Sequence, residues 1–201
     1  MDIQTGETAV KTARKAIDLW VREGKRLHPE GLPEFFEQEL GVFVTIHTYP
    51  ERKLRGCIGF VEPNFPLSRG LVEAGIYATQ DPRFPRLRKE ELDRVVVEVS
   101  VLTKPEPIEV RNPEELPERI RIGRDGLIAR MGFYNGLLLP QVATEHGMNE
   151  EDFLSHVCMK AGLPPDEWRK GRVKIYRFQA EVFSEERPYG RVYKIENTNI
   201  E

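Results

Sequence analysis

Apolar residues recur three or four positions apart in several stretches of this 201-residue chain, which is the spacing of one face of an α-helix. The first stretch runs from Val10 to Leu27 with charged residues such as Arg14 between the apolar ones, so it predicts a helix over residues 5–27. The same pattern predicts helices over 66–80, 140–146 and 150–161, with short helical turns over 34–40 and 164–169.

Alternation of apolar and other residues predicts two strands, over 42–49 and 54–60, joined by a turn over 50–53. We expect them to form an antiparallel hairpin. In one pairing register the apolar residues of both strands lie on the same face, and a slip of one residue would move the apolar residues of one strand to the opposite face. This register predicts the following facing pairs: Val44 with Ile58, Ile46 with Gly56, Thr45 with Cys57, and His47 with Arg55.

Further strands are predicted over 95–103, 120–122 and 173–183, and a hairpin turn at Asn135-Gly136 joins strands over 127–131 and 137–139. Strands and helices interleave irregularly, which indicates an α+β fold with a largely antiparallel sheet packed with helices. No glycine-rich nucleotide-binding motif of the two common kinds is present. We expect a single domain over 1–201, in which a small lobe can be inserted in a larger lobe that holds both termini.

Charge and cysteine content narrow the function classes. Thirty basic residues nearly balance 33 acidic ones, so there is no strong nucleic-acid signature, and a nucleic-acid partner would need a local patch. Cys57 and Cys158 cannot build a disulfide framework or a usual zinc site, and we predict no metal. With no long apolar run and no signal-peptide pattern, the chain is expected to be cytoplasmic and away from membranes. Its many charges and 15 prolines are typical of thermophile proteins.

The segment Leu54-Arg55-Gly56-Cys57-Ile58-Gly59 is the first candidate for chemistry. Two glycines in a strand indicate that something approaches its backbone closely, which would leave room for a ligand and free backbone N–H donors. Arg55 would lower the pKa of the Cys57 thiol, so Cys57 and Arg55 are the candidate catalytic residues. The alternative is a small buried cysteine in a tightly packed strand.

Other polar residues are candidate binding groups beside Gly56 and Gly59. Asp81 and Arg83 lie in a proline-stiffened loop and form either a wall of the site or an ordinary salt bridge. Glu98 interrupts a strand of valines, where it either pairs with Arg55 as acid and base or faces water. His47 shares the predicted face of the cysteine, as an activating base or as a structural residue.

The hexapeptide at 54–59 resembles the hallmark motif of the AMME syndrome candidate-region (AMMECR) protein family, of archaeal or bacterial type. The resemblance continues, in order along the chain, in Asp81-Pro82-Arg83-Phe84-Pro85, in Gly136-Leu137-Leu138-Leu139-Pro140-Gln141-Val142-Ala143, and in Cys158-Met159-Lys160-Ala161-Gly162-Leu163-Pro164 with Trp168. It implies a two-lobed α+β domain with the hexapeptide facing a cleft between lobes. It also implies an association with radical S-adenosylmethionine proteins, and an RNA-related or modification role without a known reaction.

Two functional hypotheses follow. In the first, a cleft around Arg55, Cys57 and Gly59 binds an anionic or carbonyl-bearing small molecule, or a modified nucleotide, with Cys57 as nucleophile or acid–base group. In the second, the protein is a non-catalytic adaptor or regulatory partner, for example of a radical S-adenosylmethionine protein. The sequence leaves open whether the protein is an enzyme, and it names no cofactor, substrate or oligomeric state.

Overall fold

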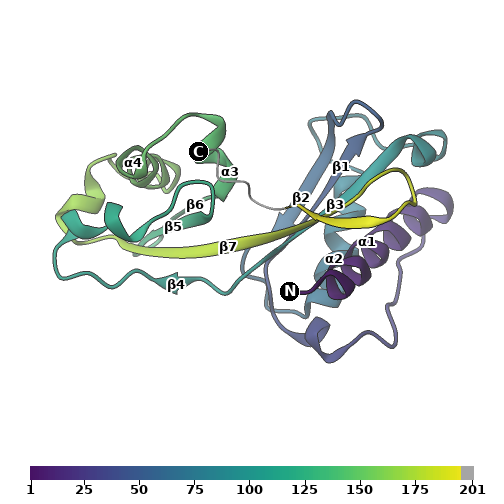
Figure 1. Ribbon diagram of the computed structural model, residues 1–201, viewed down its shortest axis with the longest axis horizontal. Helices are drawn as coiled ribbons and strands as arrows, with labels where there is room; N and C mark the ends of the chain where they lie inside the picture. The colour runs from purple at the N-terminus through teal and green to yellow at the C-terminus, as the bar shows by residue number, and fades with distance from the viewer. Residues whose placement is uncertain (196–201) are drawn as a thin grey trace. The chain divides into compact units, whose positions relative to one another are not determined.

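The computed structural model describes residues 1–195 and divides the chain into two compact units (Figure 1). Within the described residues, unit 1 comprises 1–102 and 181–195, and unit 2 comprises 103–180. The long strand β7 (Lys174–Glu185) contributes its first part to unit 2 and its last five residues to unit 1. Each unit has its own hydrophobic core.

Unit 1 is an antiparallel sheet in the order β2-β1-β3 with two helices packed on one face. The apolar residues of β1 and β3 that alternate toward this face meet the apolar stripes of both helices in a dry core. The C-terminal end of β7 pairs with a last strand. The elements of unit 1 are α1 (Ile3–Glu23), η1 (Glu34–Glu37), β1 (Val42–Thr48), β2 (Leu54–Phe60), α2 (Leu67–Ala78), η2 (Lys89–Arg94), β3 (Val95–Leu102) and β8 (Val192–Ile195).

Unit 2 is an antiparallel sheet in the order β4-β7-β5-β6, covered by helices around the fully buried Trp168 and Phe153. Asn149 caps the main helix of this unit by accepting a hydrogen bond from the Asp152 N–H at 2.9 Å. The elements of unit 2 are β4 (Glu106–Pro107), η3 (Pro113–Glu115), η4 (Pro117–Arg119), β5 (Asp125–Met131), β6 (Tyr134–Leu138), α3 (Pro140–Glu145), α4 (Glu150–Lys160) and η5 (Glu167–Lys170).

The predicted α+β class is confirmed, whereas two local predictions in unit 2 were wrong. Residues 120–122 form no strand. Asn135-Gly136 lies inside β6, and the hairpin turns instead at Gly132, whose φ of 59° suits glycine. A Cβ on Gly136 would lie 2.2 Å from the Ala161 backbone nitrogen, so this glycine lets the end of α4 approach the sheet. Among the described residues no helix is both long and apolar enough to cross a membrane.

The predicted β1–β2 register is confirmed from Val44 to Ile46 and fails after it. Thr45 pairs with Cys57 as expected. A bulge after Ile46 then pairs His47 with Leu54, so the expected pair of His47 with Arg55 was wrong. Because the bulge lies beyond the Thr45–Cys57 pair, the face that carries Cys57 is the predicted one.

Candidate functional site

A row of three polar side chains crosses the sheet of unit 1 on the face opposite its core. Thr45 of β1 pairs with Cys57 of β2 on one side and with Glu98 of β3 on the other. Residues that face one another in adjacent strands point to the same side of the sheet, so the three side chains form a line. The Thr45 hydroxyl donates a hydrogen bond to the Cys57 Sγ at 3.2 Å. We call this line the Cys57 row.

The electrostatics of the row differ from the sequence-based expectation for Cys57. Burial raises the pKa of the Cys57 thiol above its ordinary value, and the Thr45 hydrogen bond and the charge of Arg83 offset this only in part. The expected lowering of its pKa by Arg55 was therefore wrong. Cys57 is a half-buried, protonated thiol at neutral pH rather than a thiolate.

The neighbours of Cys57 on this face are also perturbed by burial. Glu98 is half-buried, and burial raises the pKa of its carboxyl group against the opposing charge of Arg52. Within residues 1–195 it accepts no hydrogen bond. Burial, with the charge of Arg52, lowers the pKa of His47, and no hydrogen-bond partner among the described residues meets its buried Nδ1 atom. The face therefore holds polar groups whose uncharged forms are favoured.

Other parts of the protein fill the space beside the two glycines of the motif, which was expected to be open to a ligand. A Cβ on Gly56 would lie 2.1 Å from the Ala78 carbonyl oxygen, so Gly56 admits the end of α2. A Cβ on Gly59 would lie 2.4 Å from the ring of Phe43, which covers this glycine from the paired position on β1. The glycines permit close packing, as the alternative interpretation of the motif proposed.

Asp81 and Arg83 bind the outer edge of β2 at Cys57. The Cys57 N–H donates to the Asp81 carboxylate at 2.9 Å, and Arg83 donates to the Cys57 carbonyl oxygen at 3.3 Å. Arg83 also binds Asp81 with its Nε and Nη2 atoms at 3.0 and 2.7 Å. These bonds hold the pKa of the buried Asp81 well below its usual range. We call this pair the edge clamp, because it takes the place of a neighbouring strand.

Arg55 has a different partner from the one expected. Its guanidinium binds Glu91 of η2 through Nε at 2.9 Å and Nη2 at 3.1 Å, and donates to the Pro85 carbonyl oxygen at 2.8 Å. The expected pair of Arg55 with Glu98 was therefore wrong. Arg55 holds the segment between α2 and η2 against β2.

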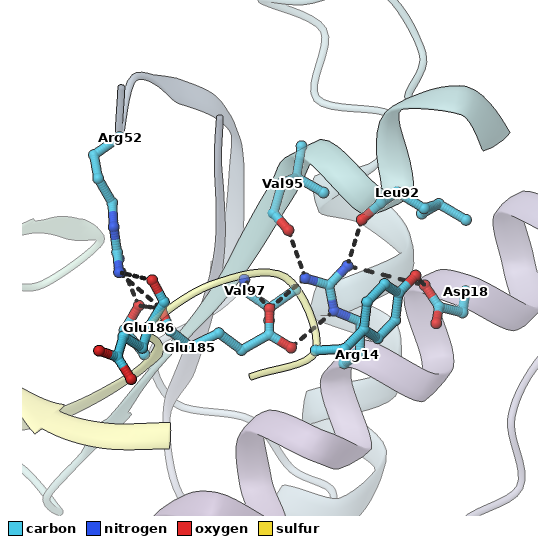
Figure 2. Close-up of polar contacts among 10 residues, drawn as sticks. Arg14, Asp18, Arg52, Leu92, Val95, Val97, Glu185 and Glu186 are labelled. Atoms are coloured by element: carbon cyan, nitrogen blue, oxygen red, sulfur yellow. Dashed lines mark hydrogen bonds and ion pairs between the residues drawn. The ribbon is translucent and has the colours of Figure 1, made fainter. Parts of the chain in front are cut away.

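A second arginine–carboxylate pair, which the sequence reasoning missed, lies in the interior of unit 1 (Figure 2). Arg14 of α1 binds both carboxylate oxygens of Glu185 at the end of β7, and donates to the Val95 carbonyl oxygen at 2.7 Å. Glu185 in turn accepts the Val97 N–H at 2.9 Å. We call this pair the buried clamp.

Arg52, in the turn between β1 and β2, binds the same end of β7 as the buried clamp. Figure 2 shows Arg52 reaching the chain at Glu185 and Glu186, where its Nη2 donates to the Glu185 carbonyl oxygen at 2.7 Å. Its Nη1 donates to the Ser184 hydroxyl at 2.8 Å. The positive charge of Arg52 also acts on Glu98 and His47, a role that no local pattern around residue 52 signals.

Unit 1 thus combines an α+β sandwich with a polar sheet face and a motif strand that is clamped along its outer edge. Among the described residues no group of three or more His, Cys, Asp or Glu side chains could hold a metal ion. The family model AMMECR1 matches residues 10–183, and the chain belongs to this family.

Relatives in archaea share almost the whole length of the chain. Protein MJ0810 of Methanocaldococcus jannaschii is 52% identical over 193 residues, which cover 96% of each chain. A protein of Thermococcus gammatolerans is 54% identical over 192 residues, or 93% of each chain. The crystal structure of the uncharacterized protein PH0010 from Pyrococcus horikoshii superposes with a TM-score of 0.85 at 48% identity, covering 97% of this chain and 98% of that one. These similarities support the fold and the family membership.

Proposed function

We propose that the Cys57 row is a binding site for a small polar molecule that carries a carbonyl group. The observation that carries this proposal is the line of Cys57, Thr45 and Glu98 on one sheet face, beside a histidine with an unpartnered nitrogen. Half-buried polar groups without partners gain free energy when a ligand completes their hydrogen bonds. Burial favours the uncharged forms of Glu98 and His47, and uncharged groups bind a ligand through hydrogen bonds rather than through charge, so a neutral carbonyl compound or modified nucleoside fits better.

In this proposal Cys57 acts as a neutral thiol that donates a hydrogen bond, and a chemical role would be that of a weak acid. The raised pKa supports this role over that of a nucleophile. Cys57, Gly56 and Gly59 shape the strand, whereas Arg55, Asp81 and Arg83 hold it in place. The single-domain organisation and the cytoplasmic location stay predictions.

Alkylation by iodoacetamide, with the modified peptide identified by mass spectrometry, tests the state of the thiol. We expect an apparent pKa for Cys57 above its ordinary value of 9.0, and a rate at neutral pH below that of free cysteine. Thr45→Val removes the hydrogen bond that favours the thiolate, so it raises this apparent pKa further. A Cys57 that reacts faster than free cysteine at pH 7 contradicts the neutral-thiol role.

Binding is tested separately by NMR, with neutral nucleosides and small amides as probes. We expect amide shifts at residues of the Cys57 row in the native protein and their loss in Cys57→Ala and Thr45→Val. Lys15→Gln, an exposed position on α1, is the matched control and keeps the shifts. Shifts that persist in both row variants would assign the binding to another surface.

The second candidate, a non-catalytic adaptor, is favoured by one observation. Arg55, Asp81 and Arg83 all bind other parts of this chain, as residues with a structural role do. The partner class expected from the family resemblance is a radical S-adenosylmethionine protein. Co-purification with such a protein, retained in Cys57→Ala, supports the adaptor; a chain recovered without a partner contradicts it.

A further inference from the structure

Unit 2 contains a pocket of about 360 Å³ that is lined mainly by charged and polar side chains. Its cationic residues are Lys104, Arg124 and Arg177, its acidic residue is Glu106, and Gln179 adds a side-chain amide. The pocket lies along β7, next to its pairing partners β4 and β5. When the buried Asp125 beside Arg124 is counted with Glu106, three positive charges face two negative ones, which leaves a net charge of +1.

Asp125 holds two of the side chains that line this pocket, Arg124 and Gln179, by hydrogen bonds. Its fully buried carboxylate accepts hydrogen bonds from Arg124 Nε at 2.9 Å and Nη2 at 3.1 Å, and from Gln179 Nε2 at 3.1 Å. The Arg121 N–H adds a further bond at 3.0 Å. Burial alone would raise the pKa of Asp125, but these bonds lower it, so the carboxylate stays charged. Arg124 and Gln179 are thereby held in place before any ligand arrives.

The cationic groups keep donors that no residue of the chain uses. Within residues 1–195, Arg124 Nη1 makes no hydrogen bond, and Arg177 uses only Nη1, toward the Arg119 carbonyl oxygen at 3.3 Å. Lys104 has no ion pair or hydrogen bond in the part of the chain that the structure describes. Several N–H donors from three side chains therefore remain for an occupant of the pocket.

We propose that this pocket binds the phosphate group of a small phosphomonoester. Guanidinium and ammonium groups are the usual partners of phosphate, and a phosphate offers three terminal oxygens to the three cations, whereas a carboxylate offers two. The pocket is larger than a phosphate ion, so it has room for part of the esterified group. The site is separate from the Cys57 row and does not depend on the function proposed for it.

Titration of the full chain with glycerol 3-phosphate at pH 8 and constant ionic strength, followed by NMR, tests the proposal. We expect saturable shifts of the amides around Lys104, Arg124 and Gln179. Lys104→Gln removes one charge-assisted contact without breaking an internal bond, and should weaken binding about tenfold. Lys15→Gln makes the same charge change on α1 and should leave the affinity unchanged.

Parallel titrations with inorganic phosphate and acetate identify the chemistry that is recognised. Tighter binding of glycerol 3-phosphate than of inorganic phosphate, with no saturable response to acetate, supports a phosphomonoester site. Equal responses to acetate and phosphate would overturn the assignment to phosphate. Absence of saturation with glycerol 3-phosphate, or equal affinity in Lys104→Gln and the native chain, would overturn the site itself.

Discussion

Two arginine–carboxylate pairs in unit 1 make the same pattern of bonds in very different surroundings. In the buried clamp, Glu185 accepts a strand N–H from Val97 and Arg14 donates to a strand carbonyl. In the edge clamp, Asp81 accepts the N–H of Cys57 and Arg83 donates to its carbonyl. Both pairs take the place of backbone groups that a neighbouring strand would offer.

The difference lies in the arginine. The Arg14 and Glu185 side chains are 5% and 4% exposed, whereas Arg83 is 57% exposed over an Asp81 that is 1% exposed. When a partner is lost, water can replace the exposed guanidinium, but a charge left inside the protein has no such substitute. Although the hydrogen bonds are similar, removing a partner from the buried clamp should therefore lower the free energy of unfolding more than removing one from the edge clamp.

The largest expected effect is that of Glu185→Ala, which leaves the buried Arg14 charge with only the more distant Asp18 carboxylate, at 4.0 Å, and leaves the Val97 N–H without its acceptor. We expect a loss of about 3–5 kcal/mol in the free energy of unfolding. Urea denaturation measures it. The double variant Arg14→Met/Glu185→Leu removes both charges and should recover much of the loss. A cost for Glu185→Ala below about 1 kcal/mol would show that burial does not separate the two clamps.

A smaller effect is expected for Asp81→Asn, which weakens the edge clamp at its buried end. We expect a loss of about 1–3 kcal/mol in the free energy of unfolding at neutral pH, because the amide keeps one acceptor oxygen and puts an NH2 donor where the second carboxylate oxygen accepts from Arg83. The folded-state pKa of Asp81 is lowered. The extra unfolding free energy that the Asp81 charge gives the native protein is therefore fully present above the unfolded-state pKa of about 3.9.

The pH dependence of the unfolding free energy tests the prediction for Asp81→Asn. The difference in unfolding free energy between the native protein and Asp81→Asn should be constant from pH 7 to about 5 and should shrink as the pH falls below about 4. Denaturation at a series of pH values measures it. A difference that does not change with acidity would mean that the Asp81 charge contributes nothing to the clamp.

Sequence pattern predicted the elements of the fold wherever local spacing decides the structure. The alternation in residues 95–102 and the helical stripe of α1 both correspond to elements at those positions. The turn at Asn135-Gly136 was mispredicted because Gly136 serves the packing of α4, which a local pattern does not contain. Arg14 was placed among the charged residues between apolar positions, although its partner Glu185, 171 residues away, makes it a core residue.

For the candidate site, sequence reasoning found the residues and mistook several of their partners. It singled out Cys57, Asp81 and Arg83, and the structure brings these three together. It joined Arg55 to Glu98, whereas Arg55 binds Glu91, 36 residues further along the chain. Which charges meet is decided by the path of the loop between α2 and β3, and residue spacing carries no record of that path.

The smallest expected effect is that of Arg83→Lys, which keeps the charge of the edge clamp and loses its bidentate contact with Asp81. A lysine at this exposed position still reaches the carboxylate through one ammonium group, so we expect a loss below about 1 kcal/mol in the free energy of unfolding. Arg111→Lys, an exposed arginine of unit 2, is the matched control and should show no measurable change. Urea denaturation of both variants beside the native protein decides it. If Arg83→Lys costs as much as Glu185→Ala, then both clamps depend on fork geometry, and exposure to water is not what distinguishes them.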